Sequence, residues 1–197
     1  MRYLSTFLTI FFSVIFPALT VADNWQVDYP QSKLEFIAIQ EGSPMRGSFK
    51  HYRADINFDP QRLSKSRFQV WVETSSVDTG ADERDQILRS AEFFDSTRWP
   101  QAEFKTTSIS HLQGTRYQAL ALLSIRNIEK PLLFPFSLEI IKEPHQSRLM
   151  GNGQISINRF DFDMAQGDWA DTSLLGKTIT IEVTIQDTRA STVEATQ

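Results

Sequence analysis

A strict alternation of apolar and polar residues is the feature that most constrains the fold of this chain. In "KTITIEVTIQD" (177–187), apolar residues occupy every second position from Ile179 to Ile185, with threonine and glutamate between them. "SRFQVWVETS" (66–75) and "PLLFPFSLEII" (131–141) repeat the pattern. Successive side chains of an extended strand point to opposite faces, so the alternation predicts β-strands that each bury one face.

Eight such segments place the chain in the all-β class. Turn sequences with glycine or proline, such as "EGSP" (41–44) and "QGT" (113–115), separate neighbouring strands. Short connections join antiparallel neighbours, and eight such strands with one apolar face each form a closed barrel or a sandwich. The predicted strands are 32–39, 46–58, 66–76, 102–112, 116–126, 131–142, 148–160 and 176–187.

The fifth predicted strand, 116–126, differs from the others because "YQALALLSI" (117–125) is apolar on both faces. A strand of this kind needs cover on its outer side as well as its inner side. We expect that outer face to be covered within the chain or to form a contact in a homodimer.

One segment between the third and fourth predicted strands departs from the alternation. Thr79 and Asp82 have the spacing of a helix N-terminal cap. Ile87, Leu88 and Phe94 follow at spacings that place them on one face of a two-turn helix. The sequence therefore predicts a short inserted helix whose apolar side is buried against the rest of the protein.

The first 22 residues have the pattern of a secretory signal peptide. Arg2 precedes the apolar run "LSTFLTIFFSVIFPAL" (4–19), and small residues at 20 and 22 suit cleavage before Asp23. A membrane-spanning anchor is the alternative, which Pro17 and the modest length of the run oppose. We expect a signal peptide at 1–22, a periplasmic barrel domain at 23–188 with no stable membrane anchor, and a polar tail at 189–197.

Charge and cysteine content exclude several partners and cofactors. The net charge of −4 becomes −5 once Arg2 is removed with the signal peptide, so nucleic acid is not an expected partner. The chain has no cysteine, which excludes disulfides, zinc–thiolate sites and iron–sulfur clusters. The hydrophobic core alone must therefore stabilise the fold.

Candidates for catalysis or metal binding are few. His51, His111 and His145 are the only histidines, and no two have the spacing of a metal site. The acids within 82–95 suggest a hydrolase as one alternative, but helix capping and pairing with nearby arginines explain their positions. No nucleophile-elbow, phosphate-loop or dinucleotide motif occurs. We expect no catalytic residue, no metal and no enzymatic activity.

Phenylalanine supplies much of the predicted interior. Most phenylalanines after the signal peptide fall on the inward-facing positions of their strands. Such an interior is either solid or lines an apolar tube, because an eight-stranded barrel has just enough space inside for one slender ligand. The alternation by itself leaves both alternatives open.

Four segments resemble the YceI family of periplasmic, lipocalin-like proteins. "WQVDYPQSKLEF" (25–36) is similar to the family's opening strand, and "RGSFKHYRADINFDP" (46–60) to its G-x-F…I-x-F-D segment. "VETSSVDTGADERDQILRSAEFFDSTRWPQAEF" (72–104) carries Ser-Val-Asp-Thr, Arg-Asp-x-x-Leu, Phe-Phe-Asp and Trp-Pro-x-x-x-Phe at the family's spacing. "ALLSIRNIEKPLLFPFSLE" (121–139) resembles its L-x-I-R-G-x-x-K-P segment.

The resemblance implies an eight-stranded antiparallel lipocalin-like barrel that wraps a long apolar cavity. It further implies a non-catalytic lipid-binding protein, often dimeric, that holds an isoprenoid or fatty-acyl chain for transport, storage or stress response. A structural or partner-binding barrel with a filled core is the alternative. The residues expected to contact the chain lie on inward strand positions or on the inserted helix: Leu34, Phe36, Phe49, Phe58, Phe68, Val70, Ile87, Leu88, Phe93, Phe94, Phe104, Phe134, Phe136, Ile181 and Val183.

Two features depart from the family's pattern. Its histidines near Gln31-Ser32 and Ile39-Gln40 are absent, and Asn127 stands where the family has glycine. If those histidines hold a polar head group in the family, this chain must recognise the head group differently or not at all. The apolar tube itself does not depend on them.

Overall fold

The computed structural model describes residues 24–190, which form eleven strands, one α-helix and four short 3₁₀ helices. The strands are β1 (Asn24–Val27), β2 (Lys33–Gln40), β3 (Ser43–Phe49), β4 (Tyr52–Asn57), β5 (Arg67–Glu73), β6 (Val77–Asp78), β7 (Gln101–Gln113), β8 (Arg116–Ile125), β9 (Ile128–Lys142), β10 (Gln146–Asn158) and β11 (Thr178–Ala190). The helices are α1 (Asp82–Arg89) and the 3₁₀ helices η1 (Leu63–Lys65), η2 (Thr74–Ser76), η3 (Arg159–Phe162) and η4 (Gly167–Ala170).

The eleven strands occupy eight barrel positions, because three of the eight positions hold two consecutive strands. β1 and β2 follow one another along the same edge of β11, β3 leads into β4, and β5 leads into β6. β1 pairs with both β4 and β11, which closes the ring β1-β4-β5-β7-β8-β9-β10-β11. The predicted eight-stranded antiparallel barrel is therefore confirmed, as is the helix between its third and fourth strands.

The observed strand boundaries correct three predictions. The strand predicted at 46–58 is broken at Lys50 and His51, because β3 pairs with β2 whereas β4 pairs with β1. The four residues of β1 are too few to show a period in the sequence, and they were not predicted as a strand. β11 continues to Ala190, so it includes the first two residues of the predicted tail. The remainder of that tail and the predicted signal peptide lie outside the described residues.

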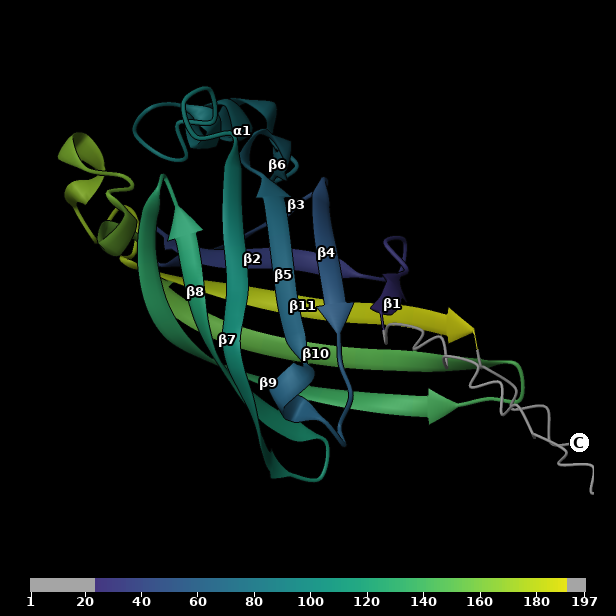
Figure 1. Ribbon diagram of the computed structural model, residues 1–197. Helices are drawn as coiled ribbons and strands as arrows, with labels where there is room; N and C mark the ends of the chain where they lie inside the picture. Colours follow the sequence, from purple (N-terminus) through teal and green to yellow (C-terminus); the bar gives the residue numbers. More distant parts are fainter. Residues whose placement is uncertain (1–23, 191–197) are drawn as a thin grey trace, which may run out of the picture.

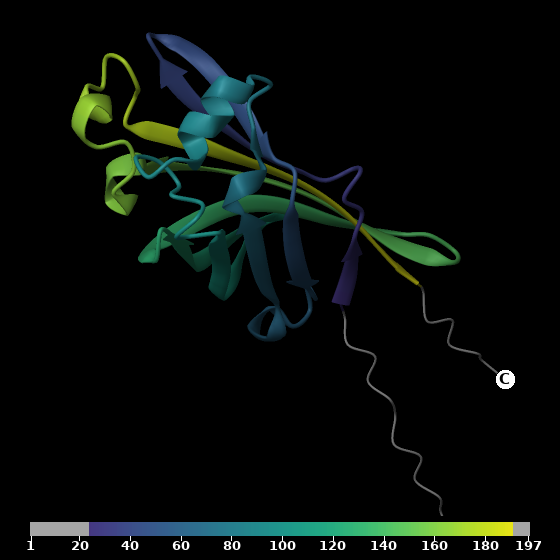
Figure 2. The same ribbon diagram turned by 90° about the horizontal axis from the view of Figure 1, so that it is seen from above.

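The barrel is flattened into two layers that cross (Figure 1). In that view β4, β5 and β7 run steeply in front, while β9, β10, β11 and β2 run across behind them. Figure 2 shows α1 and the segment that carries η3 and η4 gathered at one end of the barrel. The largest group of buried apolar residues lies between the layers and includes Phe58, Phe68, Tyr117 and Leu149.

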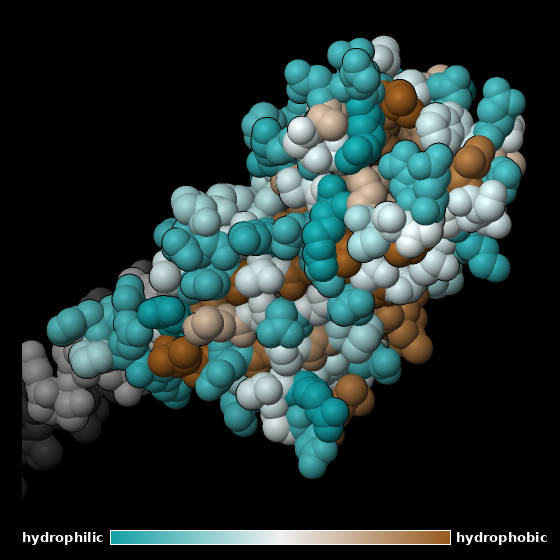
Figure 3. Space-filling model, turned by 180° about the vertical axis from the view of Figure 1, so that it is seen from behind, coloured by the Kyte–Doolittle hydropathy of each residue, from teal (hydrophilic) through white to brown (hydrophobic). Residues whose placement is uncertain are grey.

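The outer surface is mostly polar, as the alternation requires. Seen from behind, hydrophilic and neutral residues cover most of the molecule, with apolar residues scattered among them (Figure 3). Trp71, on the outward face of β5, is covered by the guanidinium group of Arg53, which lies 3.9 Å from the ring centroid. Within residues 24–190, no helix has both the length and the apolar character needed to cross a bilayer.

Candidate functional site

The barrel contains an apolar cavity with a volume of about 460 Å³. Its walls are the inward faces of β2–β5 and β7–β11, and α1 contributes to one end. The lining side chains are predominantly aliphatic and aromatic. A volume of this size and a lining of this kind are typical of pockets that bind small apolar molecules.

A continuous row of aromatic rings forms one wall of the cavity. The ring centroids of Phe68 and Phe136 are 5.4 Å apart, those of Phe136 and Phe134 are 5.8 Å apart, and those of Phe134 and Phe104 are 5.4 Å apart. Edge-to-face and offset contacts of this kind stabilise the rings in fixed positions. The rings therefore support one another, although the wall borders open space.

The segment that follows β6 closes one end of the cavity. Leu88 and Phe93 are buried there together with Phe36 and Val77 of the strands. Ile87 also lines the cavity, yet it remains 40% exposed, so the cavity reaches solvent beside α1. The apolar side of the inserted helix thus borders the barrel interior, as the sequence predicted.

Asp85 holds this segment in place, and the predicted cap formed by Thr79 with Asp82 is wrong. The N-cap residue is Ala81, whose side chain makes no capping bond. Instead the Asp85 carboxylate accepts hydrogen bonds from the backbone N–H of Thr79 at 2.8 Å and from its hydroxyl at 2.7 Å. Thr79 belongs to the motif that predicted the helix, but its partner is Asp85, three residues beyond the predicted Asp82.

Arg159 organises the second segment at the same end of the cavity. Its guanidinium group is almost fully buried and donates hydrogen bonds to the backbone carbonyls of Met164, Ala165, Trp169, Leu175 and Gly176. Burial lowers the pKa of this side chain. The carbonyl oxygens supply the partial negative charge that a buried cation needs.

Trp169 connects the two segments at this end. Its ring lies 5.2 Å from that of Phe93 in an edge-to-face contact, and both residues line the cavity. Arg126 adds a hydrogen bond of 2.7 Å to the carbonyl of Phe93. The cavity end is therefore built from residues distant in sequence, which the alternation of the strands does not reveal.

The structure brings the sequence-predicted contact residues together, with one exception. Phe58 does not line the cavity; it packs against Phe68 and Tyr117 at the opposite, filled end of the barrel. The other predicted residues all line the cavity: Leu34, Phe36, Phe49, Phe68, Val70, Ile87, Leu88, Phe93, Phe94, Phe104, Phe134, Phe136, Ile181 and Val183. Their contact with a ligand remains a prediction.

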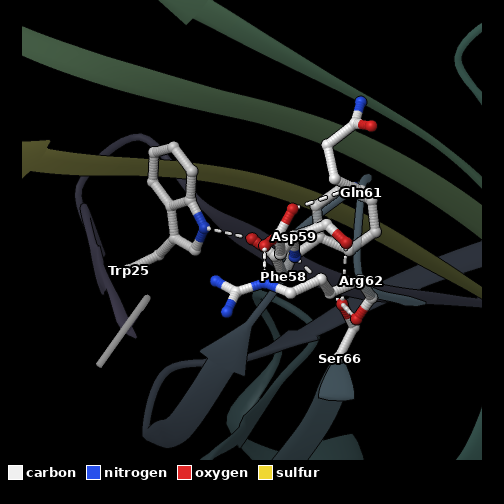
Figure 4. Close-up of polar contacts among 6 residues, drawn as sticks. All are labelled: Trp25, Phe58, Asp59, Gln61, Arg62 and Ser66. Atoms are coloured by element: carbon white, nitrogen blue, oxygen red, sulfur yellow. Dashed lines mark hydrogen bonds and ion pairs between the residues drawn. The ribbon is translucent and has the colours of Figure 1, made fainter. Parts of the chain in front are cut away.

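The turn that follows Phe58 explains why that end is filled. Trp25 Nε1 donates to the Phe58 carbonyl at 3.2 Å, and Arg62 pairs with Asp59 at 2.6 Å (Figure 4). The Ser66 hydroxyl accepts a hydrogen bond from the Asp59 N–H at 2.9 Å. These contacts hold the turn across the base of the barrel, so Phe58 is packed beneath it.

Several lining residues were missed by the sequence analysis. Leu123 and Ile125 of β8 line the cavity, but their strand is apolar on both faces, so its alternation indicated no inward side. Ile155 and Ile157 of β10 do alternate with polar residues and could have been found. Tyr52 also lines the cavity and supplies one of its few polar groups.

The histidines and the acids of the segment around α1 are the candidates for a metal site. No group of three or more histidine, aspartate or glutamate side chains in residues 24–190 could hold a metal ion. Glu92 accepts a hydrogen bond from the hydroxyl of neighbouring Ser90 at 2.6 Å, and Asp85 is bonded to Thr79. Glu92 and Asp85 therefore form hydrogen bonds with neighbouring residues of their own segment.

Comparison with known proteins places this barrel in a family. A YceI-like domain matches residues 25–187, which is most of the chain. The chain belongs to the YceI family. A UPF0312 protein of Photorhabdus laumondii is 27% identical over 151 residues, covering 72% of this chain and 77% of that protein. Protein YceI of Salmonella arizonae is 33% identical over 107 residues, covering 54% of this chain and 50% of the Salmonella protein.

Solved structures show the same YceI fold. BcnA of Burkholderia cenocepacia superimposes with a TM-score of 0.74 at 24% identity, covering 82% of this chain and 99% of that one. A polyisoprenoid-binding domain from Saccharophagus degradans has a TM-score of 0.65 at 13% identity, covering 85% of this chain and 98% of that one. These likenesses concern the barrel architecture.

Proposed function

We propose that this YceI-family protein binds one isoprenoid or fatty-acyl chain in its barrel and carries or stores it in the periplasm. The observation that carries the proposal is the cavity of about 460 Å³ with its apolar lining. The polyisoprenoid-binding domain of Saccharophagus degradans, which has the same fold, adds support. The protein acts by binding, without catalysis, metal or any cofactor beyond the lipid.

The energetics of burial favour a long apolar ligand. Each methylene group removed from water contributes about 0.8 kcal/mol. The aromatic wall and α1 contribute side chains such as Phe134 and Leu88, which already border the cavity. A preformed cavity of this type costs little conformational entropy when it binds its ligand.

Native mass spectrometry of the mature protein, extracted gently from its own cells, tests the proposal. We expect a mass above that of the polypeptide by the mass of one prenyl or acyl lipid. The same measurement after incubation with both lipid classes extends the test to a protein that lost its ligand during purification. A bare polypeptide mass in both experiments would support the alternative of a partner-binding barrel.

We also propose that the outer face of β8 and β9 is the contact of a homodimer. Leu120 and Leu133 are cross-strand partners there, and they are 46% and 57% exposed. Contiguous exposed apolar patches mark protein contact surfaces. Analytical ultracentrifugation of wild type and Leu133→Glu should give a dimer and a monomer; a wild-type monomer at high concentration contradicts this assignment.

A further inference from the structure

The apolar cavity occupies only part of the barrel, and aromatic rings separate it from the filled part. Phe68 of β5 and Phe136 of β9 line the cavity, and their ring centroids are 5.4 Å apart. Phe58 and Tyr117 are buried in the filled part and do not line the cavity. The two lining rings, Phe68 and Phe136, therefore form the floor of the cavity.

Each floor ring rests on a ring of the filled part. Phe68 contacts Phe58 with ring centroids 6.1 Å apart, and Phe136 stacks on Tyr117, its cross-strand partner, at 5.6 Å. Phe58 and Tyr117 also contact one another, with centroids 5.2 Å apart. Because protein interiors are close-packed, a bound chain passes the floor only if it displaces one of these rings.

The filled part behind the floor is a packed core. Trp25 donates its indole N–H to the Phe58 carbonyl oxygen at 3.2 Å, and the ring of His111 lies 5.0 Å from that of Tyr117. Leu149 belongs to the same group of buried residues and has no exposed surface. The barrel beyond the floor is therefore occupied by side chains that pack against one another.

On the other side of the floor, inward side chains border open space. Val70 follows Phe68 on the inward face of β5, yet Phe68 is buried whereas Val70 is only half-buried. Val70 lines the cavity, as do the half-buried Ile181 and Val183 of β11. The step from Phe68 to Val70 thus marks where the space for a ligand begins.

The cavity volume sets the length of chain that this space can enclose. Apolar cavities of about 150 Å³ take up benzene, which corresponds to about 25 Å³ per carbon atom. At that ratio, the cavity of about 460 Å³ encloses roughly 18 carbon atoms. This number matches a palmitoyl or stearoyl chain, or a prenyl chain between farnesyl and geranylgeranyl in length.

We infer that Phe68 and Phe136 act as a length stop, so that the cavity encloses roughly 18 carbon atoms of a bound chain and no more. The inference rests on the proposed lipid-binding function and adds the chain-length class of the ligand. A longer polyprenyl chain leaves its remaining carbon atoms in water, where they contribute nothing to affinity and favour return to a membrane.

Binding of chains of graded length to the delipidated mature protein tests the inference. The probes are the even-numbered primary alcohols from dodecanol to docosanol, and farnesol, geranylgeraniol and geranylfarnesol as a branched series. Displacement of a fluorescent fatty-acid analogue measures each affinity, at concentrations where the alcohols do not self-associate. We expect affinity to rise up to about fourfold per added methylene and to level off near octadecanol. Geranylfarnesol should bind no more tightly than geranylgeraniol.

Two variants should move the length limit in opposite directions. Phe136→Ala removes a floor ring, and the limit should rise by about four carbon atoms, since the surroundings collapse into part of the vacated space. Val70→Phe places a ring in the open space beside the floor and should lower the limit; it serves alone if Phe136→Ala does not fold. Ile109→Ala is the control, because Ile109 is buried in the filled part without lining the cavity.

The outcomes separate this inference from the proposed function. Affinity that levels off before tetradecanol, or that keeps rising to docosanol, overturns the length limit but leaves lipid binding intact. A limit that is the same in wild type and in the folded variants of Phe136 and Val70, or that moves equally in Ile109→Ala, overturns the role of the floor. Failure of the analogue and of every alcohol to bind the folded protein overturns the lipid-binding function as well.

Discussion

The Asp85 carboxylate accepts two hydrogen bonds from Thr79, one from its backbone N–H and one from its hydroxyl. Asp85 lies in the first turn of α1, and Thr79 directly follows β6, the short strand that pairs with β3. This pair therefore fixes the start of the cavity-closing helix to the edge of the barrel wall.

Replacement of Asp85 with alanine should loosen that attachment. We expect a loss of about 1–3 kcal/mol in the free energy of unfolding, because the Thr79 donors lose their buried partner. Urea unfolding followed by tryptophan fluorescence measures the loss. Asp82→Ala is the control, since Asp82 lies in the same helical turn but is exposed, and it should change stability by under about 0.5 kcal/mol. Equal effects at the two positions would contradict the assigned role of Asp85.

Closure of the cavity by the segment after β6 can be separated experimentally from simple packing of that segment. Phe94 is partly buried and contacts Phe49 with ring centroids 5.5 Å apart, so Phe94→Ala should leave the barrel folded. We expect the variant to release bound lipid at least several-fold faster, as measured by transfer to acceptor vesicles. Replacing Phe93 as well should cost about 3–5 kcal/mol, because Phe93 is buried.

Phe58→Ala is the matched control for this experiment. Phe58 is the same residue type and is fully buried, but it lies outside the cavity. It should lower stability by about 3–5 kcal/mol without selectively accelerating lipid release. Unfolding of the Phe94→Ala variant under native conditions would instead indicate that the segment is a packed barrel end.

The ionisation of the Asp187 carboxyl group makes the stability of the protein depend on pH. Burial, with a contribution from Asp28, raises the pKa of Asp187 to about 7, above the usual value of 3.8. The folded state therefore binds more protons than the unfolded state between these values, and this group makes the protein less stable as pH rises from about 4 to about 7. Above that range its contribution is constant.

Asp187→Asn should remove that dependence. We expect the variant to gain on the order of 1–3 kcal/mol relative to wild type between pH 5 and pH 8, measured on delipidated protein by urea unfolding. The difference between the two proteins isolates this group from other carboxyls. A stability difference that does not change with pH would show that Asp187 titrates normally.

Gly153 sets the position of the Phe134 ring in the aromatic wall. A Cβ atom at Gly153 would overlap the tip of that ring, so Gly153→Ala must displace Phe134. We expect a loss of about 1–3 kcal/mol in stability and weaker binding of long chains. The double variant Gly153→Ala/Phe134→Leu removes the overlap, and it should be more stable than the two single effects added together. Additive effects would show that the glycine and the ring are independent.

The alternation of apolar and polar residues predicted the strands well where the two faces of a strand differ from each other in polarity. The predicted ranges of β9, β10 and β11 nearly match the observed ones. In β11, for example, the sequence "TITIEVTI" places its apolar residues on one face only. The break at Lys50 and His51 could not be predicted, because it arises where β3 pairs with β2 and β4 pairs with β1. Pairing partners are properties of the closed barrel, which local periodicity does not encode.

The reliance on local periodicity also limited the prediction of the cavity-lining residues. Alternation tells which side chains point inward, but it does not tell how far along the barrel they lie. Phe58 and Phe68 both point inward, yet only Phe68 borders the cavity. The burial of Asp187 could not be predicted either, because an acid at the end of an apolar row resembles the end of a strand, and only the structure shows that β1 pairs beside it.

The Arg159 guanidinium group lies over the Phe160 ring, and all the hydrogen bonds given for it go to main-chain oxygens. Every residue type presents the same carbonyl, so the side chains between Met164 and Gly176 are free to change during evolution without loss of these bonds. Lysine could not replace the arginine, since an ammonium group has three donors and no planar fork. A single arginine side chain can thus preserve the shape of this end of the barrel while the sequence around it diversifies.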